Sequence, residues 1–122
     1  MKKPATPTWA DEVPIYRQLM DLLVARILDG VYAEEQMLPS VRQLAQECDL
    51  NPLTVAKVYK ELAREGFIDK FRGEGLMLRK GVRGILLRRE RSRFIKEEWP
   101  ALQSRLSRLG IDLRVLAGAA GN

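Results

Sequence analysis

The sequence of 122 residues predicts a mainly α protein with one small β-hairpin. Two short amphipathic helices joined by a polar turn are indicated within residues 38–66, and two short apolar segments flank a glycine-containing turn at residues 72–75. Leucines at steps of three and four follow in the last third of the chain. A helix, a helix-turn-helix and a hairpin in this order are typical of a winged helix-turn-helix domain. We expect a short helical dimerisation tail after it.

The N-terminal region predicts a flexible arm over residues 1–13, followed by a winged helix-turn-helix domain over residues 14–80. Pro4, Pro7 and small polar residues dominate the arm, although Trp9 can still pack against the domain. A support helix is expected within residues 14–30, which begin with proline and end with glycine. The stripe along this helix consists of Ile15, Leu19, Leu22, Leu23, Arg26 and Ile27.

Capping residues mark both helices of the helix-turn-helix. Ser40 can accept a hydrogen bond from the backbone N–H of Gln43, whose side chain can reach back to Ser40. This capping box places the start of the first helix at about Val41. Asn51 is a favoured N-cap, and Pro52 suits the first helical position because an N–H there has no partner. We therefore expect the second helix to begin at Pro52.

The second helix separates an apolar face from a polar one. Its apolar residues include the three- and four-residue steps of a buried stripe. They are Leu53, Val55, Val58, Tyr59 and Leu62. The residues that lie largely off this stripe are Thr54, Lys57, Lys60 and Arg64. Gly66 supplies the left-handed residue that ends the helix.

Residues 81–122 are expected to form a helical dimerisation region. Pro100 either kinks a first helix or separates it from a second one. Such a tail has no globular core of its own, and a second copy of the chain would bury its leucines, so we expect a homodimer. The expected dimerisation residues are Ile85, Leu86, Phe94, Ile95, Trp99, Leu102, Leu106 and Leu109.

Composition restricts the function. Lys and Arg total 21 against 16 Asp and Glu, and this net charge of +5 favours a polyanionic partner. Histidine is absent and Cys48 is the single cysteine, so we expect no metal, no cofactor and no enzyme. Cys48 itself is expected to be a small half-buried apolar side chain. With no apolar leader and no run of roughly 20 apolar residues, we expect a cytoplasmic protein without a membrane partner.

The exposed helix ends are the expected DNA-contacting surface. Arg42 lies at a helix N-terminus that attracts phosphate, with a solvent or intramolecular ion-pair role as the alternative. Thr54 lies in the part of the second helix that enters the groove, or only supports its first turn. Lys57 can reach phosphate or guanine. Pro52 and Leu53 can touch a thymine methyl group or serve packing and capping.

The hairpin is expected to be a basic wing. Its glycines allow close approach to a phosphate or the minor groove, whereas Glu74 at the tip opposes phosphate unless it pairs with an arginine. The arginine-rich stretch 88–93 favours a solvated helix face over a second nucleic-acid surface. The expected DNA-binding residues are Ser40, Arg42, Asn51, Pro52, Thr54, Lys57, Lys60, Arg72, Gly73 and Gly75.

These motifs together resemble the GntR family of bacterial transcription regulators, and within it the small YtrA-type branch. The resemblance covers about residues 14–79, and the phrase at residues 108–111 is similar to the dimerisation region of that branch. It implies a dimeric winged-helix repressor on a palindromic operator. The family's arginine, recognition-helix threonine and following basic residue fall on Arg42, Thr54 and Lys57.

The chain departs from the family pattern at a few positions. Glu34 and Glu35 replace the usual Pro-Gly before the Leu-Pro-Ser phrase, which alters the turn after the support helix. In the wing, Glu74 and Leu76 replace the more usual basic residue and threonine. Pro52 stands where many relatives outside this branch have a basic residue, and Ala56 where they often have arginine, so base contacts at these two positions are not carried over from the family.

Double-stranded operator DNA is the expected partner, with half-sites roughly 34 Å or a multiple of that apart for a dimer. The alternative is an interaction protein with weakened DNA binding that pairs with another regulator through its helical tail. A small-molecule effector at the dimer interface is also conceivable, but no convergent set of polar residues in the sequence marks a pocket for one.

Overall fold

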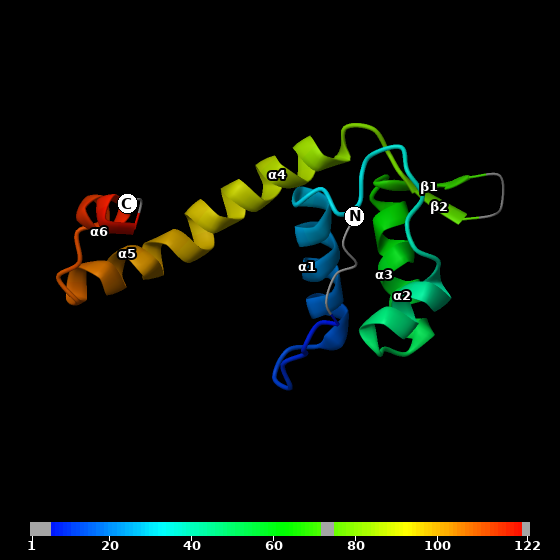
Figure 1. Cartoon of the computed structure of the whole chain (residues 1–122), viewed down its shortest axis with the longest axis horizontal. Helices are drawn as coiled ribbons and strands as arrows, with labels where there is room; N and C mark the ends of the chain where they lie inside the picture. The colour runs from blue at the N-terminus through cyan, green and yellow to red at the C-terminus, as the bar shows by residue number, and fades with distance from the viewer. Residues whose placement is uncertain (1–5, 72–74, 121–122) are drawn as a thin grey trace. The chain divides into compact units, whose positions relative to one another are not determined.

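The computed structural model describes residues 6–71 and 75–120. The chain divides into two compact units, residues 1–86 and 87–122, and each is described by itself (Figure 1). The first unit holds α1 (Ile15–Leu28), α2 (Val41–Cys48), α3 (Pro52–Arg64), β1 (Ile68–Phe71), β2 (Gly75–Leu78) and the first turns of α4 (Val82–Arg93). The second unit continues α4 and adds η1 (Phe94–Glu98), α5 (Trp99–Arg108) and α6 (Leu113–Ala120). This confirms the predicted fold class, mainly helical with one antiparallel hairpin.

Both predicted N-caps are present. Ser40 Oγ accepts from the Gln43 N–H at 3.1 Å, and Gln43 Oε1 accepts from the Ser40 N–H at 2.9 Å, so the capping box is complete. Asn51 Oδ1 accepts from the Leu53 N–H at 2.9 Å. Because each bond satisfies a backbone donor that the helix leaves free, α2 and α3 begin where the sequence predicts.

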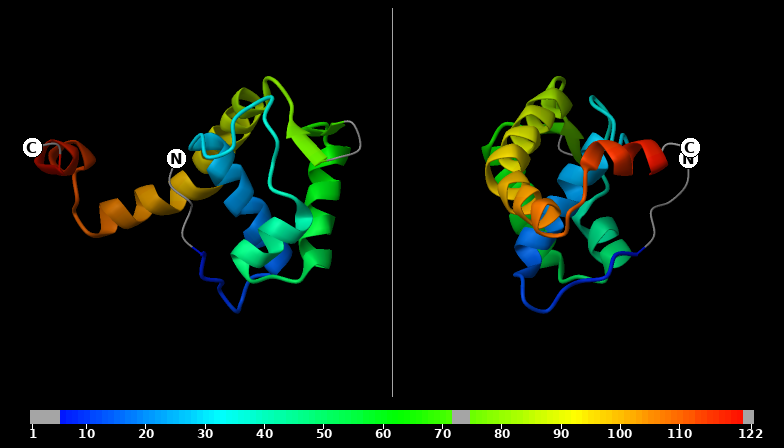
Figure 2. Two further views of the ribbon diagram at one scale, coloured as in Figure 1. Left: turned by 45° about the vertical axis from the view of Figure 1, so that its right-hand side comes forward. Right: turned by 90° about the vertical axis from the view of Figure 1, so that its left-hand side faces the viewer.

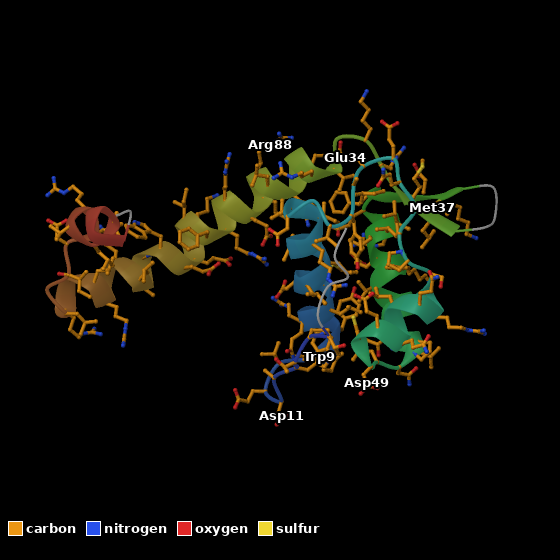
Figure 3. All side chains as sticks on the ribbon, viewed as in Figure 1. Trp9, Asp11, Glu34, Met37, Asp49 and Arg88 are labelled. Atoms are coloured by element: carbon orange, nitrogen blue, oxygen red, sulfur yellow. The ribbon has the colours of Figure 1, made fainter. Side chains whose placement is uncertain are left out.

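The turns after these helices use left-handed residues. Gly66 has a φ of 84° and ends α3 as predicted. Asp49, with a φ of 54°, makes the turn between α2 and α3 (labelled in Figure 3). Aspartate is one of the few residues other than glycine that enter this region readily, but the sequence pattern did not single it out.

The core of the first unit lies where α3 packs against α1 and α2. Its buried stripe on α3 is Val55, Val58, Tyr59 and Leu62, and Tyr59 also donates its hydroxyl to the Pro39 carbonyl at 2.6 Å. Burial raises the pKa of the Tyr59 hydroxyl above its ordinary value, so this donor stays protonated.

The start of α4 belongs to the same core. Val82 and Leu86 are 2% and 0% exposed and pack with the buried residues of the first unit. The expectation that Leu86 belongs to a dimer surface is therefore wrong, because its side chain is already covered within the chain. Ile85, on the other side of the helix, is 44% exposed.

A buried polar cluster joins α1 to α2. Arg26, 5% exposed, places Nη1 at 2.9 Å from Glu47 Oε1 and 2.7 Å from the Tyr32 hydroxyl, to which it donates. Burial acts to lower the pKa of Arg26, but the Tyr32 hydrogen bond and the Glu47 charge raise it above its ordinary value. A buried charge is tolerated only when it is paired, so this contact holds the two helices in one arrangement.

The hairpin is paired on both edges of β2. Within the sheet, Ile68 faces Leu78 and Phe71 faces Gly75. The segment between α1 and α2, which can be followed in Figure 2, bonds to the other edge: the N–H of Glu35 donates to Leu78 at 2.7 Å, and that of Leu38 donates to Leu76 at 2.8 Å. This extra pairing attaches the base of the wing to the helix-turn-helix.

The Glu34-Glu35 pair has a structural role at this point. Glu35 adopts a φ of 63°, a conformation that favours glycine. Glu34 Oε2 accepts from the backbone N–H of Arg83 at 2.9 Å, at the start of α4 (Figure 3). This bond, with a second from the Gly81 backbone, lowers the pKa of the Glu34 carboxyl. The carboxylate thus supplies an anion to a helix N-terminus.

Part of the N-terminal arm is held to the first unit. The Trp9 indole Nε1–H donates to the Cys48 carbonyl at 3.1 Å, near the end of α2 (Figure 3). The Gln18 side chain bonds to both backbone groups of Ala10 and to the carbonyl of Val13. The described part of the arm is therefore anchored rather than free, and Trp9 takes the packing role that the sequence left open.

In the second unit the helix passes Pro100 without a break because the turn before it is wider than an α-helical turn. Residues 94–98 form one π-helical turn before α5. Pro100, in the first turn of α5, can give no N–H to the preceding turn, and the wider turn accommodates this without a break. Gly110, with a φ of 67°, then ends α5 and lets α6 begin at Leu113.

Candidate nucleic-acid interface

α3 carries an exposed stripe opposite its buried one. The buried residues at 55, 58, 59 and 62 face the core, and a second set at the same spacing faces outward. This exposed stripe, which we call the α3 outer face, consists of Leu53, Ala56, Lys57 and Lys60. Because both sets lie on one rigid helix, the packing of the buried set against the core leaves the other set exposed to solvent.

Three cations of the helix-turn-helix are exposed and have no ion pair within residues 6–71 and 75–120. Lys57 and Lys60 lie on α3, and Arg42 lies in the first turn of α2. All three are exposed, and within the described residues none has an ion pair or hydrogen bond. An exposed cation without an internal partner is free to meet an external anion, and Arg42 also lies at a helix N-terminus, which itself favours an anion.

The other predicted DNA-binding residues of the helix-turn-helix lie at the starts of α2 and α3. Ser40 and Asn51 are exposed, but their side chains are used as caps. Thr54 is half-buried in the first turn of α3, so it presents only part of its side chain. Pro52 is exposed at the first helical position. Asn51, Pro52 and Thr54 thus form the N-terminal end of α3, where the α3 outer face begins, whereas Ser40 caps α2.

The opposite end of α3 has its charges neutralised. Arg64 donates through Nε to Glu61 Oε1 at 3.0 Å, with a second contact from Nη2 to Oε2. The Arg64 hydrogen bond lowers the pKa of the Glu61 carboxyl. Within the part of the chain that the structure describes, the cations of α3 without an ion pair are Lys57 and Lys60, in the central part of the helix.

The wing contributes one exposed cation beside the helix-turn-helix. Lys70 of β1 lines a groove of about 300 Å³ together with Ser40, Tyr59 and Gly75. The sequence predicts a basic wing but does not single out Lys70. The register of β1, which pairs Lys70 with Leu76, is what brings it beside the α2 cap. Arg79, by contrast, is bound to Asp69 at 2.9 Å and to the Gly66 carbonyl at 3.2 Å.

The tip of the wing lies outside the described residues. This applies to Arg72 and Gly73 of the predicted DNA-binding set, and to Glu74. Gly75 begins β2, where an added Cβ would lie 2.3 Å from the methyl carbon of Met37, so its glycine also accommodates this neighbour (Met37 is labelled in Figure 3). Met37 would have to turn its flexible end aside for any larger residue.

The second unit exposes most of the predicted dimerisation residues. Phe94, Ile95, Leu102 and Leu109 are between 42% and 62% exposed. Trp99 and Leu106 are half-buried, and no residue in the described range 87–118 is fully buried. A groove of about 520 Å³ lies between α5 and α6, lined by Trp99, Leu106 and Ile111 among others. This unit therefore has an apolar surface without an interior.

Among residues 6–71 and 75–120, no three acidic, cysteine or histidine side chains gather where they could hold a metal ion. No helix in the same ranges is long and apolar enough to cross a membrane. Cys48 is buried, and burial raises the pKa of its thiol, which disfavours the reactive thiolate.

A helix-turn-helix with an outward cationic helix and an attached hairpin defines the winged-helix class of DNA-binding protein. Comparison with known proteins identifies the family. The family described as "Bacterial regulatory proteins, gntR family" matches residues 15–78, and the chain belongs to it. The chain is thus a transcriptional regulator with a DNA-binding domain, as the sequence motifs predicted.

Three relatives illustrate the similarity. The transcriptional repressor YtrA of Bacillus subtilis (strain 168) is 36% identical over 103 residues, which is 84% of this chain and 78% of that protein. A GntR family regulator from Listeria monocytogenes has a TM-score of 0.68 at 28% identity, covering 93% of this chain and 99% of that one. YtrA from Sulfolobus acidocaldarius, a GntR-family transcription factor, has a TM-score of 0.53 at 33% identity over 70% and 89% of the two chains.

Proposed function

We propose that this protein is a repressor that binds a palindromic operator as a homodimer. The α3 outer face carries this proposal: Lys57 and Lys60 project from the helix that a helix-turn-helix inserts into the major groove, and Arg42 stands beside it. Phosphate contacts from such cations supply affinity, and base contacts near the N-terminus of α3 supply specificity. Repression is the activity named for the Bacillus relative, YtrA.

The second unit supports the dimer. Its residues 87–118 include no fully buried side chain, although Ile95, Trp99, Leu102, Leu106 and Leu109 follow one another at steps of four and three. This spacing produces a continuous apolar seam on a helix, and a second copy of the same seam is its simplest cover. A two-fold dimer pairs with a palindromic operator, since each half-site meets the same surface.

The proposal is tested with a duplex selected from a random pool by the intact protein. We expect enrichment of a palindrome whose half-sites lie about one helical turn or a multiple of it apart. Arg42→Ala should weaken binding to that duplex, whereas Arg88→Ala, an exposed arginine in the stretch of α4 that is expected to be a solvated helix face, should leave it unchanged. Retention of all duplexes alike would instead indicate non-specific binding and refute the operator.

The dimer is tested separately by sedimentation. Leu102→Asp places a charge in the seam at a position 42% exposed, so the single chain should still fold. We expect the variant to sediment as a monomer and to bind the palindrome much more weakly than the intact protein. A variant that remains dimeric would contradict the seam. Truncation at Gly81 is unsuitable for this purpose because it removes the core residues Val82 and Leu86.

A further inference from the structure

Leu53 is the most exposed large apolar residue of the structure's described part, at 70%. A single exposed leucine is common on protein surfaces and needs no explanation by itself. This one occupies the second position of α3, and its backbone N–H is held by Asn51 Oδ1 at 2.9 Å. The cap therefore orders the backbone at the point from which the side chain leaves the helix.

The neighbours of Leu53 point to a nucleic acid as its partner. Lys57 lies one turn further along the same face and Lys60 about two turns. A surface that binds a protein through an apolar patch normally contains several apolar residues. Here Leu53 is followed on the same face by two exposed lysines that have no ion pair among the described residues. The face therefore complements a polyanion, with one apolar contact at its leading end.

The surrounding residues also let Leu53 reach a base edge. Ala56, three residues further on, is small and exposed, so it holds the helix axis away from the duplex less than a long side chain would. Pro52 has no N–H to donate, and Thr54 is half-buried. Leu53 is thus the longest side chain in the first turn of α3 that projects freely.

We infer that Leu53 is a specificity-determining residue that contacts the C5-methyl group of thymine in the operator. The major groove offers hydrogen-bonding groups at every base pair, and the thymine methyl is its apolar feature. Leucine can bind that methyl but cannot satisfy a base donor or acceptor, so it selects thymine and disfavours the other bases. This inference rests on the proposed function, since it names the base chemistry that the same face recognises.

The test removes single methyl groups from the DNA. The probe is the duplex selected from a random pool by the intact protein, resynthesised with deoxyuridine in place of one thymidine at a time. At one or two positions in each half-site, we expect the intact protein to bind about fourfold more weakly, as the loss of one buried methyl group predicts. Leu53→Asn should bind the parent duplex more weakly and should lose this sensitivity. Leu53→Met, which keeps an apolar side chain, should retain it.

The possible failures are distinguishable. If the protein selects a defined duplex but is indifferent to every deoxyuridine, or if Leu53→Asn is as sensitive as the intact protein, the inference is overturned while the regulator stands. If no sequence is enriched, the proposed function fails and the inference fails with it. If Leu53→Asn changes the sedimentation of the DNA-free protein, Leu53 covers a protein contact and the inference is also overturned. Thermal unfolding of each variant serves as the folding control.

Discussion

The salt dependence of operator binding follows directly from the unpaired cations. Arg42, Lys57 and Lys60 are exposed and make no ion pair or hydrogen bond within the described residues. Each cation that meets a phosphate releases condensed counterion from the duplex, and the slope of log K against log salt is about −0.9 per contact. If all three contact phosphate in both protomers of a dimer, the slope is about −5. Affinity then falls roughly 1,000-fold between about 50 and 200 mM salt.

Removing one cation should change this slope by a predictable amount. Lys60→Gln removes two phosphate contacts from the dimer, so the slope should become less steep by about 1.8. Fluorescence anisotropy with the selected duplex over a salt series measures it. Lys96→Gln removes the same charge from η1, outside the helix-turn-helix, and is the matched control. Its slope should equal that of the unmodified protein.

The same measurement separates two roles for Lys57. A phosphate contact should reduce the slope in Lys57→Gln as much as in Lys60→Gln, with no change in sequence preference. A guanine contact should instead reduce discrimination between duplexes by roughly 1–3 kcal/mol per half-site. The reasoning from unpaired cations is refuted if Lys60→Gln and Lys96→Gln have the same slope.

Three further predictions concern stability. Leu86→Ala should lower the free energy of unfolding by about 2–5 kcal/mol because it leaves a cavity in the core. Leu53→Ala, at a position 70% exposed, should lower it far less when the two variants are compared by urea denaturation at one protein concentration. Glu35→Gly should stabilise the protein by about 0.5–1 kcal/mol, because glycine adopts the left-handed backbone conformation of this position without the steric cost of a Cβ. This gain exceeds the loss caused by the greater freedom of glycine in the unfolded chain. An unchanged or lower melting temperature would contradict this. The pKa of the Glu34 carboxyl is lowered in the folded state, so the ionised carboxylate stabilises the folded protein. This contribution is present above the pKa of the unfolded chain and is lost as pH falls through the lower pKa of the folded state. In Glu34→Gln, the melting temperature should therefore fall less steeply as pH is lowered.

Local structure in the first unit could be predicted because it depends on residues close together in the chain. The Ser40–Gln43 capping box and the Asn51 cap each act within a few residues, and both were found where the sequence predicts them. The buried and exposed stripes of α3 follow from the helical period in the same way. The candidate interface was therefore largely predictable in its residues, except that Lys70, Ala56 and Leu53 were not part of the predicted set. The sequence groups Leu53 with the apolar stripe of this helix, but it is 70% exposed because it lies on the side of α3 opposite Val55, Val58, Tyr59 and Leu62.

Contacts between distant segments could not be predicted from the same patterns. Leu86 has the spacing of a tail residue, and only packing against the first unit shows that it is core. Glu34 caps a helix that begins 48 residues later, and Arg26 finds its partner at residue 47. A linear pattern has no means to indicate such pairs, because the distance in sequence says nothing about the distance in space.

The sequence by itself determined the helix starts, the family and the cationic face of α3, since each depends on local capping chemistry, on ordered motifs or on the helical period. The tertiary structure alone decided which apolar residues are covered, which charges are paired and which stay unpaired. The physical reason is that burial and ion pairing depend on neighbours brought together by folding. Arg79 and Lys57 are equally basic in the sequence, yet Arg79 is paired with Asp69, whereas Lys57 has no carboxylate partner in residues 6–71 and 75–120.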